Sequence, residues 1–183
     1  EDRYREEYRK PIVTPWAVIN ELLQGGFGEG DFGLIFGGPG GGKSWALIAL
    51  GAAAVKAGFN VCHYTLELSE AYIGKRYDAC FTNISVAQVQ EHRKTVETAI
   101  EKLPGNLIIK EYPMGKATIN TIESHIQKCK DLGNPPDLVL IDYVDLLRAT
   151  RISKERKEEI DDVYVATKGL ARELKYQFGQ LAR

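Results

Sequence analysis

The sequence has few of the residues that form disulfides or bind transition metals. Its 183 residues include three cysteines and three histidines, which are scattered, and no Cys-x-x-Cys pair. Disulfide scaffolds and zinc sites need several such residues at short, regular spacing. We therefore expect Cys62, Cys80 and Cys129 to be reduced, buried residues of a cytosolic protein, and we expect no metal site built from cysteine or histidine.

Long apolar runs and an excess of charge of one sign are also missing. No run approaches the roughly 20 apolar residues of a membrane-spanning helix. The first ten residues, EDRYREEYRK, are charged and unlike a signal peptide. The 24 basic and 25 acidic residues give a formal net charge of −1. A nucleic acid would therefore have to be held by a local basic patch, because the overall charge does not attract it.

What the chain does contain is an alternation of strand-like and helix-like segments, in a length that suits one domain. We expect strands at 33–36, 60–67, 106–112 and within 136–147, and helices at about 43–56, 69–80, 86–103, 118–130 and 158–175. This alternation predicts an α/β fold with a mostly parallel, twisted sheet and helices on both faces. Residues 1–15 are expected to be an arm and linker, and residues 16–183 the folded domain.

The segment GGPGGGKS, residues 37–44, matches the phosphate-binding pattern G-x-x-x-x-G-K-[ST] between an apolar strand and an apolar helix. Glycines let backbone N–H groups approach phosphate oxygens and permit positive φ, and the helix N-terminus adds positive potential. We expect Lys43 to contact the β- and γ-phosphates and Ser44 to ligate Mg²⁺. The predicted nucleotide-binding residues here are Gly38, Pro39, Gly40, Gly41, Gly42, Lys43, Ser44 and Trp45.

Two carboxylates are expected near this loop. Asp142 follows the apolar run 138–141, at the carboxyl end of a strand, where ligands of open α/β sheets bind. We expect Asp142 to serve the metal as the Walker B aspartate, with Asp145 as a weaker alternative. Glu67 ends the second strand and could activate water. On chemistry alone Glu67 competes for that role with Glu70 and Asp145.

Motifs outside the phosphate loop resemble one family of motor proteins. TLELS after the second strand, LIDYVDLL at the fourth, the late helix GLARELK and the lead-in GGFGEGDFGLIFGGPGGGKS are similar to the ATPase domain of DnaB-type replicative helicases, in the RecA-like superfamily. The resemblance covers roughly residues 14 to 175. It implies a RecA-like P-loop fold and a ring, usually a hexamer, with ATP and Mg²⁺ at subunit interfaces. It also implies that Glu67 is the catalytic base and that Arg76 lies near the nucleotide base.

The same resemblance places DNA-contacting loops after the Walker B strand, and the sequence there is basic. The decamer RATRISKERK, residues 148–157, has one acid against the five basic residues Arg148, Arg151, Lys154, Arg156 and Lys157. Such a segment could hold phosphates of single-stranded DNA without reading bases. The alternative is a solvated basic turn before the next helix.

Two features depart from the family pattern. Only about 15 residues precede the domain, which leaves contacts with a primase or a helicase loader unsupported. The last residues, YQFGQLAR, lack an apolar strand of normal length. We therefore expect the domain to be incomplete near 175–183, without the central strand that follows the Walker B helix. No arginine finger or sensor can be assigned.

Three functions remain open. The leading one is a DnaB-like helicase motor that hydrolyses ATP and moves on single-stranded DNA, in a bacterial or viral replication setting. The second is a RecA/RadA-like recombinase that forms filaments. The third is a regulatory ATPase for which the basic segment is dispensable. Most aromatic rings are expected in the core or at interfaces. Tyr77, next to Arg76, is the tyrosine that we would test against nucleotide.

Overall fold

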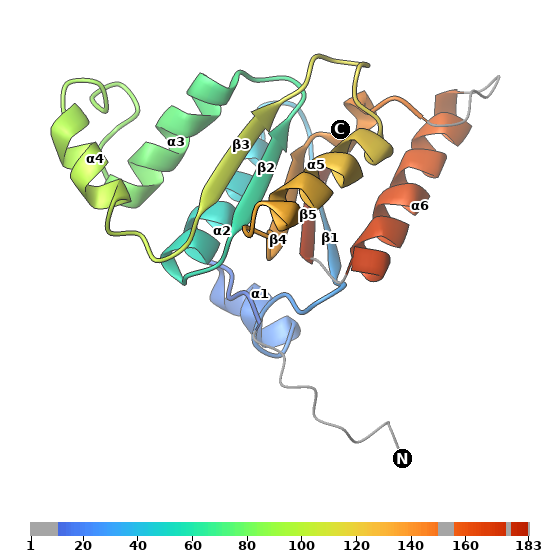
Figure 1. The fold of residues 1–183 in the computed structure, drawn as a ribbon, viewed down its shortest axis with the longest axis horizontal. Helices are drawn as coiled ribbons and strands as arrows, with labels where there is room; N and C mark the ends of the chain where they lie inside the picture. The colour runs from blue at the N-terminus through green and yellow to red at the C-terminus, as the bar shows by residue number, and fades with distance from the viewer. Residues whose placement is uncertain (1–10, 150–155, 175–176, 183) are drawn as a thin grey trace.

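A five-stranded parallel sheet forms the centre of the molecule (Figure 1). The computed structural model describes residues 11–149, 156–174 and 177–182. The strand order is β1-β5-β4-β2-β3, and every neighbouring pair is parallel. The strands are β1 (Phe32–Phe36), β2 (Val61–Thr65), β3 (Leu107–Glu111), β4 (Leu138–Asp142) and β5 (Gln177–Ala182).

Helices cover both faces of this sheet (Figure 1). One face carries α2 and α3, which pack against each other, and the other carries α5 and α6. The short α1 precedes the first strand and α4 follows α3. The helices are α1 (Ala17–Leu22), α2 (Lys43–Lys56), α3 (Glu70–Thr82), α4 (Arg93–Ile100), α5 (Ile119–Asp131) and α6 (Arg156–Leu174), with a 3-10 turn, η2, at Val144–Leu146.

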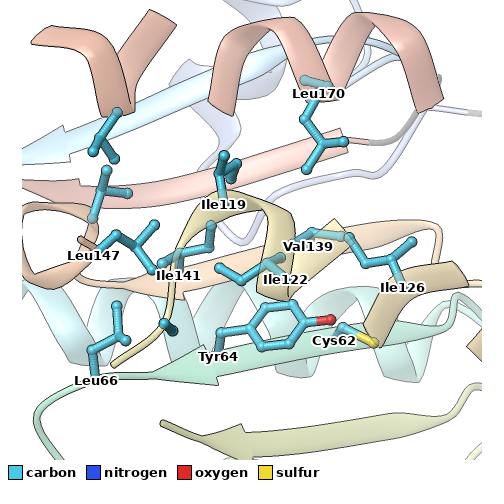
Figure 2. Packing of buried hydrophobic residues seen from close by; sticks show 14 of the residues in the cluster. Cys62, Tyr64, Leu66, Ile119, Ile122, Ile126, Val139, Ile141, Leu147 and Leu170 are labelled. Carbon is cyan, nitrogen blue, oxygen red and sulfur yellow. The ribbon is translucent and has the colours of Figure 1, made fainter. Parts of the chain in front are cut away.

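The largest part of the core lies between the sheet and α5 with α6. Figure 2 shows Tyr64 of β2 below Ile122 of α5, with Ile141 of β4 beside Ile122. All residues of β2 and of β4 are buried, because these two strands are covered on both faces. On the opposite face α2 packs so closely that a Cβ on Gly51 would overlap the Tyr77 hydroxyl. The glycine therefore fixes the distance between α2 and α3.

Local sequence signals explain where several helices begin and end. Ser69 caps α3 by accepting a hydrogen bond from the backbone of Tyr72, and Asn83 ends that helix in the left-handed conformation. Thr118 and Thr121 form a reciprocal capping box at the start of α5. The buried faces of these helices then supply most of their stability.

The predicted α/β fold with a parallel sheet and helices on both faces is confirmed, and α2 has the predicted bounds. The other predicted elements agree to within a few residues, with one exception. The predicted helix 86–103 is wrong in its first half, because the chain passes through turns until α4 begins at Arg93. Only Val89 of that half is buried, so the apolar spacing there did not reflect one helical face.

The expectation that the central strand is absent is also wrong. Residues 177–182 form β5, which lies between β1 and β4 in register with both. The segment QFGQLA is only half apolar and contains a glycine, so it gave no strand signal of its own. Backbone pairing along both sides stabilises it instead. Of the predicted arm and linker at 1–15, residues 1–10 lie outside the described residues.

Candidate nucleotide-binding site

The loop between β1 and α2 presents open backbone. Gly40 and Gly42 have φ values of 73° and 81°, in the left-handed region that favours glycine. A Cβ added to either of them, or to Gly37 or Gly38, would meet no atom within 4 Å. Glycine is therefore needed here for backbone conformation and for close approach from outside, and not because the protein itself crowds the loop.

Lys43, at the start of α2, curls back over this loop. Its Nζ donates hydrogen bonds to the carbonyl oxygens of Gly37 and Gly38, at 2.7 and 3.0 Å. The Gly38 carbonyl also accepts from the backbone of Gly41, at 3.2 Å. The lysine charge is thus held directly over the loop backbone, where phosphate oxygens could replace the two carbonyls.

A pocket of about 290 Å³ lies above the loop and brings most of the predicted site residues together. The residues come from the phosphate loop, from the first turn of α2, from the ends of β2 and β4, and from α3. They are Pro39, Gly40, Gly41, Gly42, Lys43, Ser44, Trp45, Glu67, Arg76, Asp142 and Tyr143. Of the predicted nucleotide-binding residues, Gly38 alone does not line it.

Asp142 is a buried carboxylate at the edge of this pocket. Its side chain is only 1% exposed, and neither of its oxygens has a hydrogen-bond partner among the described residues. Burial raises the pKa of Asp142 and Glu67 raises it further, whereas Ser44, Arg76 and Lys43 act in the opposite direction. Two open acceptors facing a serine hydroxyl match the donor set of a magnesium site that also uses phosphate oxygens and water. The residues therefore fit Mg²⁺.

The turn that carries Glu67 is fastened on both sides. The Thr65 hydroxyl donates to the Leu68 carbonyl at 2.7 Å and accepts from the Leu68 N–H at 3.1 Å. The N–H of Leu66 donates to the Asp142 carbonyl at 2.8 Å, which joins the turn to the end of β4. Glu67 itself is exposed and lines the pocket. These hydrogen bonds thus hold the turn in one conformation and keep Glu67 at the wall of the pocket.

The two carboxylates that compete with Glu67 are directed elsewhere. Glu70 accepts a hydrogen bond from the N–H of Glu111 at 2.9 Å, and Glu111 accepts one from the N–H of Glu70 at 3.1 Å. Asp145 accepts from the Tyr164 hydroxyl at 2.7 Å. Neither competitor lines the pocket. The geometry therefore favours Glu67 over both as the group that could act on a bound water.

The tyrosine singled out from the sequence, Tyr77, does not line the pocket. Tyr77 is 1% exposed, and its hydroxyl is 2.8 Å from Nδ1 of the buried His63. Tyr72 lies instead beside Arg76, with Trp45 on the neighbouring helix. The i, i+4 spacing of Tyr72 and Arg76 on a helix was the signal that could have indicated this pair.

Of the predicted DNA-contacting residues, Arg148 and Lys157 do not line this pocket. Arg148 and Lys157 are exposed. Arg156 is the first residue of α6, and its side chain is not described. Arg151 and Lys154 lie outside the described residues. The placement of the basic segment is therefore known only at its two ends.

None of the helices that the structure describes is long and apolar enough to cross a membrane. The described residues contain no cluster of three or more histidine, cysteine or acidic side chains that could hold a metal ion. The magnesium site considered above needs no such cluster, because one or two carboxylates together with phosphate oxygens and water suffice.

A parallel sheet with a glycine-rich loop and lysine between β1 and α2, and an acid at the end of β4, defines a P-loop nucleoside triphosphatase fold. Within this class the chain belongs to the DnaB-like helicase C-terminal domain family, whose model matches residues 12–182. This agrees with the resemblance seen in the sequence motifs.

Individual relatives point the same way. A DnaB-like replicative helicase of Enterobacteria phage T4 is 29% identical over 181 residues, which cover 94% of this chain and 37% of that protein. The replicative DNA helicase DnaB of Helicobacter pylori is 25% identical, over 94% of this chain and 38% of that protein. The chain thus spans little more than a third of the length of these curated relatives.

Solved structures share the fold. One is a DnaB-like replicative helicase described together with its interactions with primase, with a TM-score of 0.75 and 21% identity over 93% of this chain and 43% of that one. Another is the ATPase domain of G40P, with the same TM-score and identity over 93% of this chain and 64% of that one. At this identity the likeness shows the fold alone.

Proposed function

We propose that this domain hydrolyses ATP with Mg²⁺ and is the motor of a DnaB-like helicase that moves along single-stranded DNA. The observation that carries the proposal is the pocket in which the phosphate loop, Ser44, Glu67 and the buried Asp142 meet. Membership of the DnaB-like family supports it. The pocket itself is common to the recombinase and regulatory alternatives, so it is the family membership that favours the helicase motor over them.

Each side chain of the pocket has a distinct role in the proposed reaction. Lys43 exchanges its two carbonyl acceptors for the β- and γ-phosphates and balances their charge. Ser44 and Asp142 hold Mg²⁺, which when bound neutralises charge that develops on the phosphate oxygens. Glu67 orients a water molecule in line with the γ-phosphate and accepts its proton. Arg76 serves the nucleoside end.

The assembly and its nucleic acid belong to the same proposal. Family resemblance supports a hexameric ring with ATP between subunits, in which the basic segment 148–157 contacts the DNA phosphates. The exposed Arg148 and Lys157 at its two ends are compatible with that role. The sequence left contacts with a primase unsupported; a primase is now a candidate partner, because one structural neighbour is described with its primase interactions.

The test is steady-state ATP hydrolysis with and without single-stranded DNA at low salt, where phosphate contacts are strongest. Lys43→Ala serves as the inactive reference. We expect DNA to raise the rate several-fold and the combined Arg148→Ala and Lys157→Ala variant to weaken this stimulation while the basal rate persists.

The outcomes separate the three functions. Hydrolysis that DNA does not change would favour the regulatory ATPase. DNA-stimulated hydrolysis without strand displacement on a forked duplex would favour the recombinase. Absence of both hydrolysis and nucleotide binding in the wild-type chain would reject the proposal.

A further inference from the structure

Three side chains form a stack at one end of the pocket. Trp45 lies in the first turn of α2, and Tyr72 and Arg76 lie one turn apart on the neighbouring α3. The guanidinium carbon of Arg76 is 4.8 Å from the centroid of the Trp45 ring and 4.5 Å from that of the Tyr72 ring. A cation is attracted to an aromatic ring at both distances. Arg76 is thus held by rings from two helices.

The N–H groups of Arg76 are available to a ligand. Within the part of the chain that the structure describes, its guanidinium makes no hydrogen bond and no ion pair. Its charge acts on Asp142 across the pocket, where it lowers the pKa of that carboxyl. Because two rings fix the guanidinium, its donors are aimed without the cost of ordering a long side chain when a ligand binds.

Only one end of the pocket presents an aromatic surface. Trp45 and Tyr143 are the aromatic lining residues. Tyr143 is 4% exposed, so its ring faces are covered, whereas Trp45 is 41% exposed and the adjacent Tyr72 is 45% exposed. A nucleobase is a flat ring that binds by stacking on exposed aromatic and guanidinium planes. If the phosphates of a nucleotide lie over residues 37–44, its base can reach an exposed aromatic ring of the pocket lining only at Trp45.

With Arg76 at the nucleoside end, as proposed above, we propose that Tyr72 is a positioning residue that acts on the nucleoside through Arg76. The inference rests on the proposed nucleotide binding and adds a residue to it. Tyr72 does not line the pocket, but its ring supplies one of the two surfaces that hold the guanidinium. Without that ring, Arg76 leaves its place for part of the time and the nucleoside loses contact, while the phosphate loop is unaffected.

The experiment compares two ligands that share a phosphate chain. One is a slowly hydrolysed ATP analogue, and the other is inorganic tripolyphosphate, which has no nucleoside. Binding of each is measured by isothermal titration calorimetry with Mg²⁺. Tyr72→Ala is expected to weaken binding of the analogue about fivefold and to leave the tripolyphosphate constant within about twofold of wild type.

Two control variants sharpen the comparison. Tyr72→Phe keeps the ring and should bind both ligands as the wild type does. Lys75→Ala changes an exposed residue of the same helix and should also leave both constants unchanged. A circular dichroism melt verifies that Tyr72→Ala remains folded, as expected for a half-exposed side chain.

The inference is overturned if Tyr72→Ala weakens both ligands equally, if it weakens neither, or if Tyr72→Phe behaves like Tyr72→Ala. Failure of the proposed function has a different signature. In that case the wild-type chain binds neither the analogue nor tripolyphosphate, and the variants cannot differ from it.

Discussion

The two ends of the parallel sheet differ in whether their polar side chains are hydrogen-bonded to other parts of the protein. At the amino ends of the strands the polar groups pair with one another. The N–H of Asn60 donates to the Asp137 carboxylate at 2.8 Å, and Nδ2 of Asn106 donates to Oδ1 of Asn60 at 2.9 Å. These residues immediately precede β2, β4 and β3. The polar side chains at the amino ends of these three strands therefore bind one another.

At the carboxyl end of β4 the carboxylate is not paired in this way. Asp142 ends β4 with two buried oxygens that no described residue hydrogen-bonds, and Glu67, which follows β2, lines the same pocket. The glycine loop follows β1 at the same edge. A buried polar group without a partner destabilises the fold. The comparison indicates that the paired polar groups at the amino end stabilise the fold. The buried, unpaired Asp142 at the carboxyl end instead lowers the free energy of unfolding when no ligand is bound.

The largest effect is expected at the carboxyl end, in catalysis. Replacing the base carboxylate in Glu67→Gln should lower the ATP hydrolysis rate by about a hundredfold or more, because a general base contributes on this scale. Nucleotide binding should persist. Glu70→Gln is the matched control, since Glu70 is bound to β3 and lies outside the pocket. Equal losses in both variants would contradict the assignment of Glu67.

The stability of the fold should depend on pH through His63, which lies in the middle of β2, between the two ends of the sheet. His63 is fully buried, and burial lowers its pKa to about 3. The folded state disfavours the charged ring. The contribution of His63 to the free energy of unfolding is therefore complete above its unfolded pKa of about 6.5, and it is lost as the pH falls below that value. Between pH 7 and pH 5 we expect a loss of about 2 kcal/mol in the free energy of unfolding.

Urea denaturation at the two pH values measures this loss. His63→Gln, which does not titrate, should show a markedly smaller difference between them. Equal differences in wild type and variant would show that other groups cause the pH dependence.

The buried carboxylate at the carboxyl end should reduce stability in the absence of ligand. The pKa of Asp142 is raised, so the folded state holds a proton that the unfolded chain releases from about pH 3.8 upward. Stability therefore falls as pH rises through that window. Removing the charge in Asp142→Asn should stabilise the chain by about 1 kcal/mol at neutral pH.

Thermal melts with and without ATP and Mg²⁺ give the complementary result for Asp142. The ligands should raise the melting temperature of the wild type much more than that of Asp142→Asn, because binding to the folded state alone stabilises it. If Asp142→Asn melts at a lower temperature than wild type without ligand, the buried Asp142 does not destabilise the fold and the comparison of the two ends fails.

The smallest effect is expected at the amino end. Asn60→Ala removes the hydrogen bonds of its side chain to the Pro135 carbonyl and to Asn106. A loss of about 0.5 kcal/mol in the free energy of unfolding is expected, since these bonds are exposed to solvent. The Michaelis constant for ATP should not change. A large change in that constant, with stability intact, would remove the distinction between the two ends.

The candidate site could be predicted well where its signal is local. The phosphate loop, α2 and the strand-end acid Asp142 each follow from a few neighbouring residues, because glycine conformation, helix initiation and a buried strand are short-range properties. Choosing Glu67 over Glu70 and Asp145 depended on family resemblance, and the structure adds that both competitors are directed to other partners.

Long-range pairing decided what the sequence left open or predicted wrongly. By itself the sequence determined the α/β class, the glycine-rich loop between β1 and α2, and the family, since these depend on patterns along the chain. Only the tertiary structure decided that QFGQLA is the central strand β5, because pairing along both sides replaces an apolar signal. It also decided that Tyr72 faces Trp45 while Tyr77 is buried against His63. Which side chain of a helix meets a ligand depends on how neighbouring helices pack, and no local pattern records that.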